Sequence, residues 1–161
     1  MRPGDGSASP RGTEWPNGTG RWPRLIPELQ VVSLDASLRF YEDAGFAVAY
    51  ARPEEAFVML VRDGAALMLE EISGPGRRLG ADSLERPLGR GMNLQVQVTD
   101  VADLHDRMAA RGWTVVVVLE ERWYRVDDRE AGNHQFVAAD PDGYLLRFFE
   151  DLGTRDAVAP A

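Results

Sequence analysis

The chain has 161 residues, no cysteine and two histidines, His105 and His134, and its formal net charge is −8 at pH 7. This length favours one domain, or two small halves that share a core, and the missing cysteines exclude disulfides, thiolate metal sites and cysteine nucleophiles. The negative charge argues against nucleic-acid binding and is compatible with solubility or with a cationic small ligand.

Residues 1–24 are rich in Gly, Pro and Arg and contain no apolar run typical of a secretory signal. We expect a disordered tail here, because such a segment buries too little apolar surface to offset its ordering entropy. No run elsewhere approaches the ~18–20 apolar residues of a membrane span. We therefore expect a cytoplasmic protein without membrane contact, with a single domain over residues 25–153 and a loose C-terminal end over 154–161.

The first half of the domain, residues 25–72, begins with a short strand in which Leu29 and Val31 alternate with polar residues. A helix follows, with Ser33 placed as its N-cap and Gly45 where a left-handed C-cap belongs. Alternation then predicts three strands, at residues 47–51, 56–61 and 65–71. The order β-α-β-β-β is the expected unit.

The second half, residues 92–153, repeats this pattern after a linker at residues 73–91. Leu29-Gln30-Val31 matches Val96-Gln97-Val98, and Gly45-Phe46 matches Gly112-Trp113, each with an offset of 67 residues. The predicted strands are 114–119, 135–139 and 144–150, and the last two flank the turn at residues 140–143. The second half is 12 residues longer, because Gly64 and Gly143 are 79 apart and 79 − 67 = 12, and we assign the excess to a loop at residues 120–133.

Two stretches of sequence resemble a known family. Residues 31–46 resemble the opening strand and helix of the vicinal oxygen chelate superfamily, and residues 136–148 resemble its closing hairpin. Within this superfamily the chain is most similar to the bleomycin resistance proteins. The resemblance implies an α+β fold in which tandem βαβββ modules form curved half-barrels that enclose a cleft. It also implies a homodimer with its ligand at the subunit interface.

Enzymes of this superfamily hold a divalent metal on four side chains, usually His, Glu or Gln. By the internal repeat, the four corresponding positions here are Ile26, Met68, Asn93 and Arg147. None of these is a usual ligand, and the arginine would repel a metal. A register slip of two residues would instead bring in Glu28, Glu70 and Gln95. We expect no metal and no cofactor.

Polar residues on the first strand of each half are predicted to face away from the helices: Glu28, Gln30, Asn93, Gln95 and Gln97. Such a row can hydrogen-bond a polar ligand, or it can be a face wetted by solvent. Trp123 and Tyr124 are adjacent aromatics that can stack on a flat ligand, or else cover the core and face solvent, respectively. Phe57 is either a cleft aromatic or an ordinary core residue. Together with Arg147, these residues form the predicted ligand-binding set.

The sequence therefore predicts a protein that binds a small molecule without transforming it, with no catalytic residues assigned. The expected ligand is a cationic glycopeptide antibiotic of the bleomycin type, which the protein would sequester to confer resistance. One alternative is a metal-dependent lyase or dioxygenase of the same superfamily. Another is a ligand-sensing or partner-binding module that uses the tail containing Trp15 and Trp22.

Overall fold

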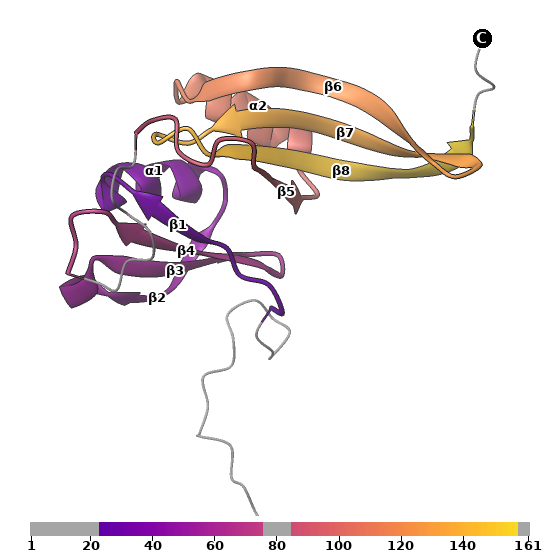
Figure 1. Ribbon diagram of the computed structural model, residues 1–161. Coiled ribbons are helices and arrows are strands. Elements are labelled where there is room, and N and C mark those ends of the chain that lie inside the picture. Colours follow the sequence, from indigo (N-terminus) through magenta and orange to yellow (C-terminus); the bar gives the residue numbers. More distant parts are fainter. Residues whose placement is uncertain (1–22, 76–84, 158–161) are drawn as a thin grey trace, which may run out of the picture.

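The computed structural model describes residues 23–75 and 85–157 (Figure 1). The tail expected over residues 1–24 lies outside these ranges except for its last two residues, so that prediction is not tested. Within the described ranges, no helix is long and apolar enough to cross a membrane.

The first module contains one helix and a four-stranded sheet. Its elements are β1 (Glu28–Val31), α1 (Leu34–Asp43), β2 (Ala47–Arg52), the short 3-10 helix η1 (Pro53–Glu55), β3 (Phe57–Arg62) and β4 (Ala65–Glu71). The strand order is β1-β4-β3-β2, in which β1 is parallel to β4 and the other pairs are antiparallel. The helix begins at the expected N-cap, where Ser33 Oγ accepts a hydrogen bond from the Ala36 N–H at 3.3 Å.

The second module repeats this topology. It consists of β5 (Asn93–Gln97), α2 (Val101–Ala110), β6 (Thr114–Val126), β7 (Arg129–Ala139) and β8 (Leu145–Asp156), with strand order β5-β8-β7-β6. The tandem βαβββ arrangement and the α+β class are confirmed. Each sheet has free edges, so the two modules form open sheets rather than closed barrels.

The prediction of a loop at residues 120–133 is wrong, because these residues continue β6 and β7 as a hairpin. β8 also runs to Asp156, into the segment expected to be a loose end, and pairs with β7 there. We call this three-stranded extension, residues 120–135 and 149–156, the arm; Figure 1 shows it reaching away from both helices. Its turn lies at Asp127 and Asp128, and Asp127 has a φ of 55°, a geometry that aspartate tolerates in tight hairpins.

The helix-bearing faces of the two sheets contribute to one shared hydrophobic core. Phe40 of α1 meets Trp113 edge-on with ring centroids 5.3 Å apart, and the Trp113 indole N–H donates to Asp43 at 2.8 Å. Arg62, at the end of β3, pairs with Asp100 at the start of α2 at 2.5 Å. The opposite face of each sheet therefore points away from this core, and we call it the distal face.

The turn that closes the second module also joins it to the first. Asp142 Oδ2 accepts the Val32 N–H at 2.9 Å, and Asp142 Oδ1 pairs with Arg86 at 2.7 Å. Gly143 has a φ of +94°, and a Cβ there would lie 2.5 Å from Pro87 Cβ. Glycine is thus required at this position both by the backbone conformation and by the close approach of the linker.

Candidate ligand-binding faces

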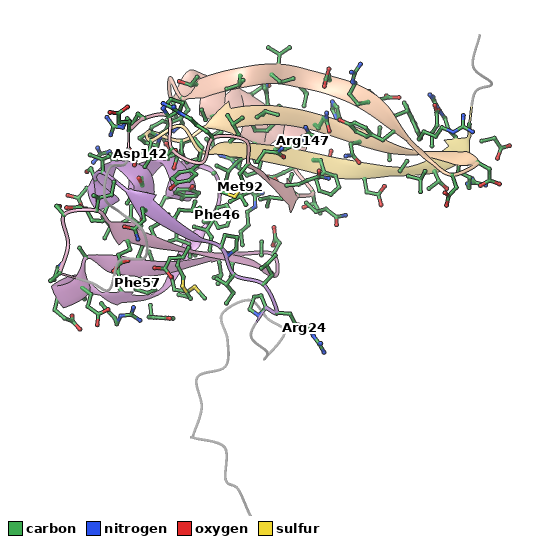
Figure 2. The ribbon with its side chains drawn as sticks, in the orientation of Figure 1. Arg24, Phe46, Phe57, Met92, Asp142 and Arg147 are labelled. Carbon is green, nitrogen blue, oxygen red and sulfur yellow. The ribbon has the colours of Figure 1, made fainter. Side chains whose placement is uncertain are left out.

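The predicted ligand-binding residues fall into two sets on different modules. Glu28, Gln30 and Phe57 lie on the first sheet, and the remaining six lie on the second. Phe57 and Arg147, one from each sheet, are labelled in Figure 2, where they belong to the lower and the upper module. Because both helix-bearing faces are used in the shared core, the two sets do not form one enclosed site within a single chain.

An acidic pair dominates the distal face of the first sheet. Glu70 is 3 % exposed and accepts a hydrogen bond from Gln30 Nε2 at 2.9 Å. Burial raises the pKa of the Glu28 carboxyl, and the charge of Glu70 and a hydrogen bond with it raise this pKa further. Gln30 Oε1 is buried and has no hydrogen-bond partner among the described residues. Two carboxylates in partly desolvated surroundings favour a cationic group between or beside them.

An apolar patch adjoins this acidic pair. Phe57, Met59 and Val61 alternate along β3 and form a small cluster separate from the shared core. Arg52 lies 3.7 Å above the centre of the Phe57 ring, and the Tyr50 ring is 5.9 Å from it, centre to centre. Phe57 is therefore on the distal face, as a cleft aromatic would be, but Arg52 covers its ring in this structure.

A hydrogen-bonded chain crosses the distal face of the second sheet. Gln135 is 2 % exposed, and its Nε2 donates to Glu120 at 3.1 Å and to Tyr124 Oη at 2.8 Å. Arg147 Nη1 donates to the same Tyr124 oxygen at 3.3 Å. Gln95 lies next to Arg147 in the register of β5 and β8. The amide side chains of β5 are exposed at Asn93, Gln95 and Gln97.

The two adjacent aromatics lie on opposite faces of the arm, because successive side chains of a strand alternate. Tyr124 belongs to the hydrogen-bonded chain just described. Trp123 instead packs against Gly132, lies under Arg155 at 4.0 Å, and donates from its indole N–H to Glu121 at 2.6 Å. The structure thus brings Tyr124, but not Trp123, together with the other predicted residues of the second sheet.

The residues at the family's metal positions do not fit a metal centre. In the strand register Met68 pairs with Glu28 rather than Ile26, and Arg147 pairs with Gln95 rather than Asn93. The second sheet would therefore offer one neutral amide and one cation, and the carboxylates of the first sheet lie on a separate face. Among the described residues no three His, Asp or Glu side chains are grouped closely enough to hold a metal ion.

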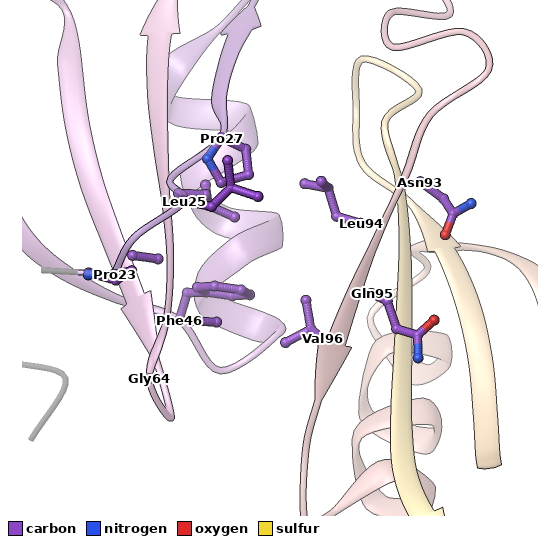
Figure 3. A pocket seen from close by; sticks show the side chains of 12 residues that line it. Pro23, Leu25, Pro27, Phe46, Gly64, Asn93, Leu94, Gln95 and Val96 are labelled. Atoms are coloured by element: carbon purple, nitrogen blue, oxygen red, sulfur yellow. The ribbon is translucent and has the colours of Figure 1, made fainter. Parts of the chain in front are cut away.

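A cavity of about 290 Å³ lies between the modules, and its lining includes Asn93 and Gln95 of the amide row but neither residue of the acidic pair. In Figure 3, Leu94 and Val96 of β5 point toward Phe46 and the chain segment at Leu25, whereas Asn93 and Gln95 point the other way. The alternation of β5 thus separates an apolar wall from the amide row that was predicted to bind ligand. The cavity belongs to the joint between the modules.

The sequence matches the Glyoxalase/Bleomycin resistance protein/Dioxygenase superfamily over residues 26–148. That is most of the chain, and this protein belongs to that superfamily. No curated protein matches the chain.

The chain is also similar to several solved structures. TioX from Micromonospora sp. ML1 is 21 % identical and has a TM-score of 0.60, with 81 % of this chain and 100 % of that chain covered. A superfamily member from Vibrio splendidus 12B01 is 37 % identical, with 79 % and 97 % covered and a TM-score of 0.36. A bleomycin-binding protein complexed with bleomycin is 20 % identical, with 80 % and 98 % covered and a TM-score of 0.49.

Three polar residues of these faces were not predicted from the sequence as ligand-binding residues. Glu70 was expected at a strand end, with attraction of a cationic ligand or a slipped metal register as the alternatives, and Glu120 and Gln135 were assigned to a loop and to a strand start. The period-two pattern of β7 contained the signal for Gln135, since it alternates with the buried Phe136 and lies on the face of Val137.

Proposed function

We propose that this protein is a non-catalytic binding protein that sequesters a cationic small molecule of the bleomycin type. The observation that carries the proposal is the acidic pair on the first sheet. Glu28 and Glu70 lie beside the aromatic ring of Phe57 and the amide oxygen of Gln30, which has no partner within residues 23–75 and 85–157. A ligand with a cationic group and a flat ring matches this combination of groups.

We further propose that the binding cleft forms between two copies of the chain. Within one chain the two distal faces point away from the shared core, so a ligand that lies on one face leaves the other unused. In a two-fold dimer, the first sheet of each copy can face the second sheet of its partner, which gives two equivalent clefts. This arrangement agrees with the homodimer that the family resemblance implies.

Binding rather than catalysis is supported by the groups that the two faces present. The second sheet offers a cation at a position where the family's enzymes place a metal ligand, and its other groups are hydrogen-bonding amides, a phenol and the Glu120 carboxylate, which accepts a hydrogen bond from Gln135. We therefore assign the protein a role in cytoplasmic drug sequestration, in which the bound antibiotic is kept from its target.

The test is a fluorescence titration of the full chain with metal-free and copper-loaded bleomycin, combined with sedimentation to measure the oligomeric state. We expect saturable binding of one drug molecule per chain to a dimer. Because the acidic pair holds the cation, the double variant Glu28→Gln/Glu70→Gln should bind at least about tenfold more weakly, which corresponds to about 1.4 kcal/mol.

Glu42→Gln is the matched control, since Glu42 is exposed on α1 and therefore does not lie on the distal face. It should leave the affinity unchanged. No saturable response up to about 100 µM drug, weaker than roughly −5.5 kcal/mol, would refute the bleomycin assignment. An unchanged affinity in the double variant would instead refute the role of the acidic pair.

A further inference from the structure

We propose that the distal face of the second sheet is a carboxylate-binding site, in which Arg147, Tyr124 and Gln95 hold an anionic group of the ligand. This inference rests on the proposed function, because it describes the other wall of the same cleft. With the acidic pair on the first sheet, it predicts that the cleft also takes small molecules that carry a carboxylate together with a cationic group.

The first argument is the unbalanced charge of Arg147. None of the ion pairs among the described residues includes it. Its side chain is half-buried, its Nε has no hydrogen-bond partner there, and Nη1 bonds only to the neutral Tyr124 oxygen. A partly desolvated guanidinium without a counter-charge is unfavourable, and a bound anion removes that cost.

The second argument is the direction of the Tyr124 hydroxyl proton. The Tyr124 oxygen accepts two hydrogen bonds, from Gln135 Nε2 and from Arg147 Nη1. Gln135 cannot turn its amide around, because its Nε2 also donates to the Glu120 carboxylate. Both lone-pair positions of the phenol are therefore used, and its own O–H is left to donate to a ligand. Tyr124 is 38 % exposed, so a ligand can reach it.

The third argument is the amide beside the arginine. Gln95 is exposed, pairs with Arg147 in the strand register, and makes no side-chain hydrogen bond within the part of the chain that the structure describes. A planar guanidinium flanked by a free phenol proton and the NH2 group of a free amide presents a row of donors to a ligand. One cation with neutral donors matches a planar monoanion, and arginine recognises carboxylates through such a planar fork.

The experiment uses the full chain and two probes of the same shape, benzoate and benzamide, which differ in charge. Backbone and side-chain N–H signals are followed by NMR during each titration. We expect benzoate to shift the Gln95 side-chain amide and the Arg147 Nε–H saturably, and benzamide to bind at least tenfold more weakly. Arg147→Met should weaken benzoate binding at least tenfold, and Tyr124→Phe by a smaller factor.

Arg129→Met is the control, because Arg129 lies at the far end of the arm in an exposed pair with Asp156. It should leave the benzoate affinity unchanged. Arg147→Lys keeps the charge but lacks the fork, and it should recover only part of the affinity even if Arg147→Met folds poorly. Equal binding of the two probes, a benzoate dissociation constant above about 10 mM, or unchanged affinity in both Tyr124→Phe and Arg147→Lys would overturn the proposal.

The bleomycin titration separates the two proposals. Benzoate binding that depends on Arg147, without any bleomycin binding, would support the carboxylate site and refute the drug assignment. Bleomycin binding that depends on Glu28 and Glu70, without any benzoate response, would support the drug assignment and refute the carboxylate site.

Discussion

Asp140 is a carboxylate that is almost entirely surrounded by protein groups. It is 5 % exposed and accepts the backbone N–H groups of Asp142 and Tyr144 at 2.9 Å and the Tyr41 hydroxyl at 3.2 Å. Burial raises the pKa of Asp140 to about 6, and the three hydrogen bonds offset this only in part. Its ionised form is therefore disfavoured in the folded state relative to the unfolded chain.

This cost predicts a pH dependence with a definite sign. A carboxyl whose pKa is higher in the folded state destabilises the protein when ionised, and that loss is recovered as the pH falls through about 6 toward the ordinary value. Asp140→Asn removes this ionisable group and should therefore be more stable relative to the natural chain at pH 7 than at pH 4.5. The difference in free energy of unfolding between variant and natural chain should change by about 2 kcal/mol between the two pH values. Urea denaturation at both pH values measures this difference.

Asp103→Asn is the control, since Asp103 is exposed on α2. Its effect on the free energy of unfolding should be nearly the same at both pH values. A pH-independent effect of Asp140→Asn would show that burial does not raise the pKa of this carboxyl.

At the scale of single residues, the sequence predicted which side chains share a face but not what they contact. The alternation in β1 and β5 correctly indicated that Glu28, Gln30 and Gln95 turn away from the helices. It could not indicate that Gln30 binds Glu70, which is 40 residues further along the chain. Such contacts depend on strand order, which local periodicity does not contain.

The arm is the element that differs most from the sequence prediction. Residues 122–126 and 129–133 flank a two-residue turn, which is a hairpin signal that the charged composition of the segment obscured. The strands of the first module were predicted to within one residue at each end, because their apolar alternation is strong. Charged, exposed strands lack that signal and depend on cross-strand pairs instead.

One such cross-strand pair is open to test. A Cβ on Gly132 would lie 2.7 Å from the ring of Trp123, so Gly132→Val should displace the ring and loosen the arm. The arm lies outside the shared core, and we therefore expect its amides to exchange at least tenfold faster while core amides are unchanged. Hydrogen exchange followed by NMR measures both groups.

The double variant Trp123→Ala/Gly132→Val serves as the control for this steric argument. Removal of the ring makes room for the added side chain, so the two substitutions together should disturb the arm less than the sum of the single effects. Strictly additive effects would mean that the ring and Gly132 do not meet.

For the molecule as a whole, the shared core makes each module depend on the other. Arg62 is 8 % exposed and links them through its pair with Asp100, and it also donates to the Ala44 carbonyl of its own module. Arg62→Met leaves the Ala44 carbonyl without this donor and leaves Asp100 only the longer pair with Arg107 at 3.4 Å, and it should lower the free energy of unfolding by about 3 kcal/mol. Arg129→Met, in an exposed pair, should change it by less than about 1 kcal/mol.

Chemical denaturation of both variants measures these values, and the transition should stay a single one in each. Two separate transitions would mean that the modules fold independently. The sequence predicted the repeat of the modules, but it did not predict their relative placement, which depends on contacts between them such as Trp113 with Asp43.

The outward direction of the two distal faces links drug binding to protein concentration. In the proposed dimer each ligand bridges two chains, so it favours association, and association in turn raises the affinity for ligand. At low expression most chains are single and each offers half a cleft. The amount of drug retained should then rise faster than in proportion to the amount of protein, so that protection sets in above a threshold of expression.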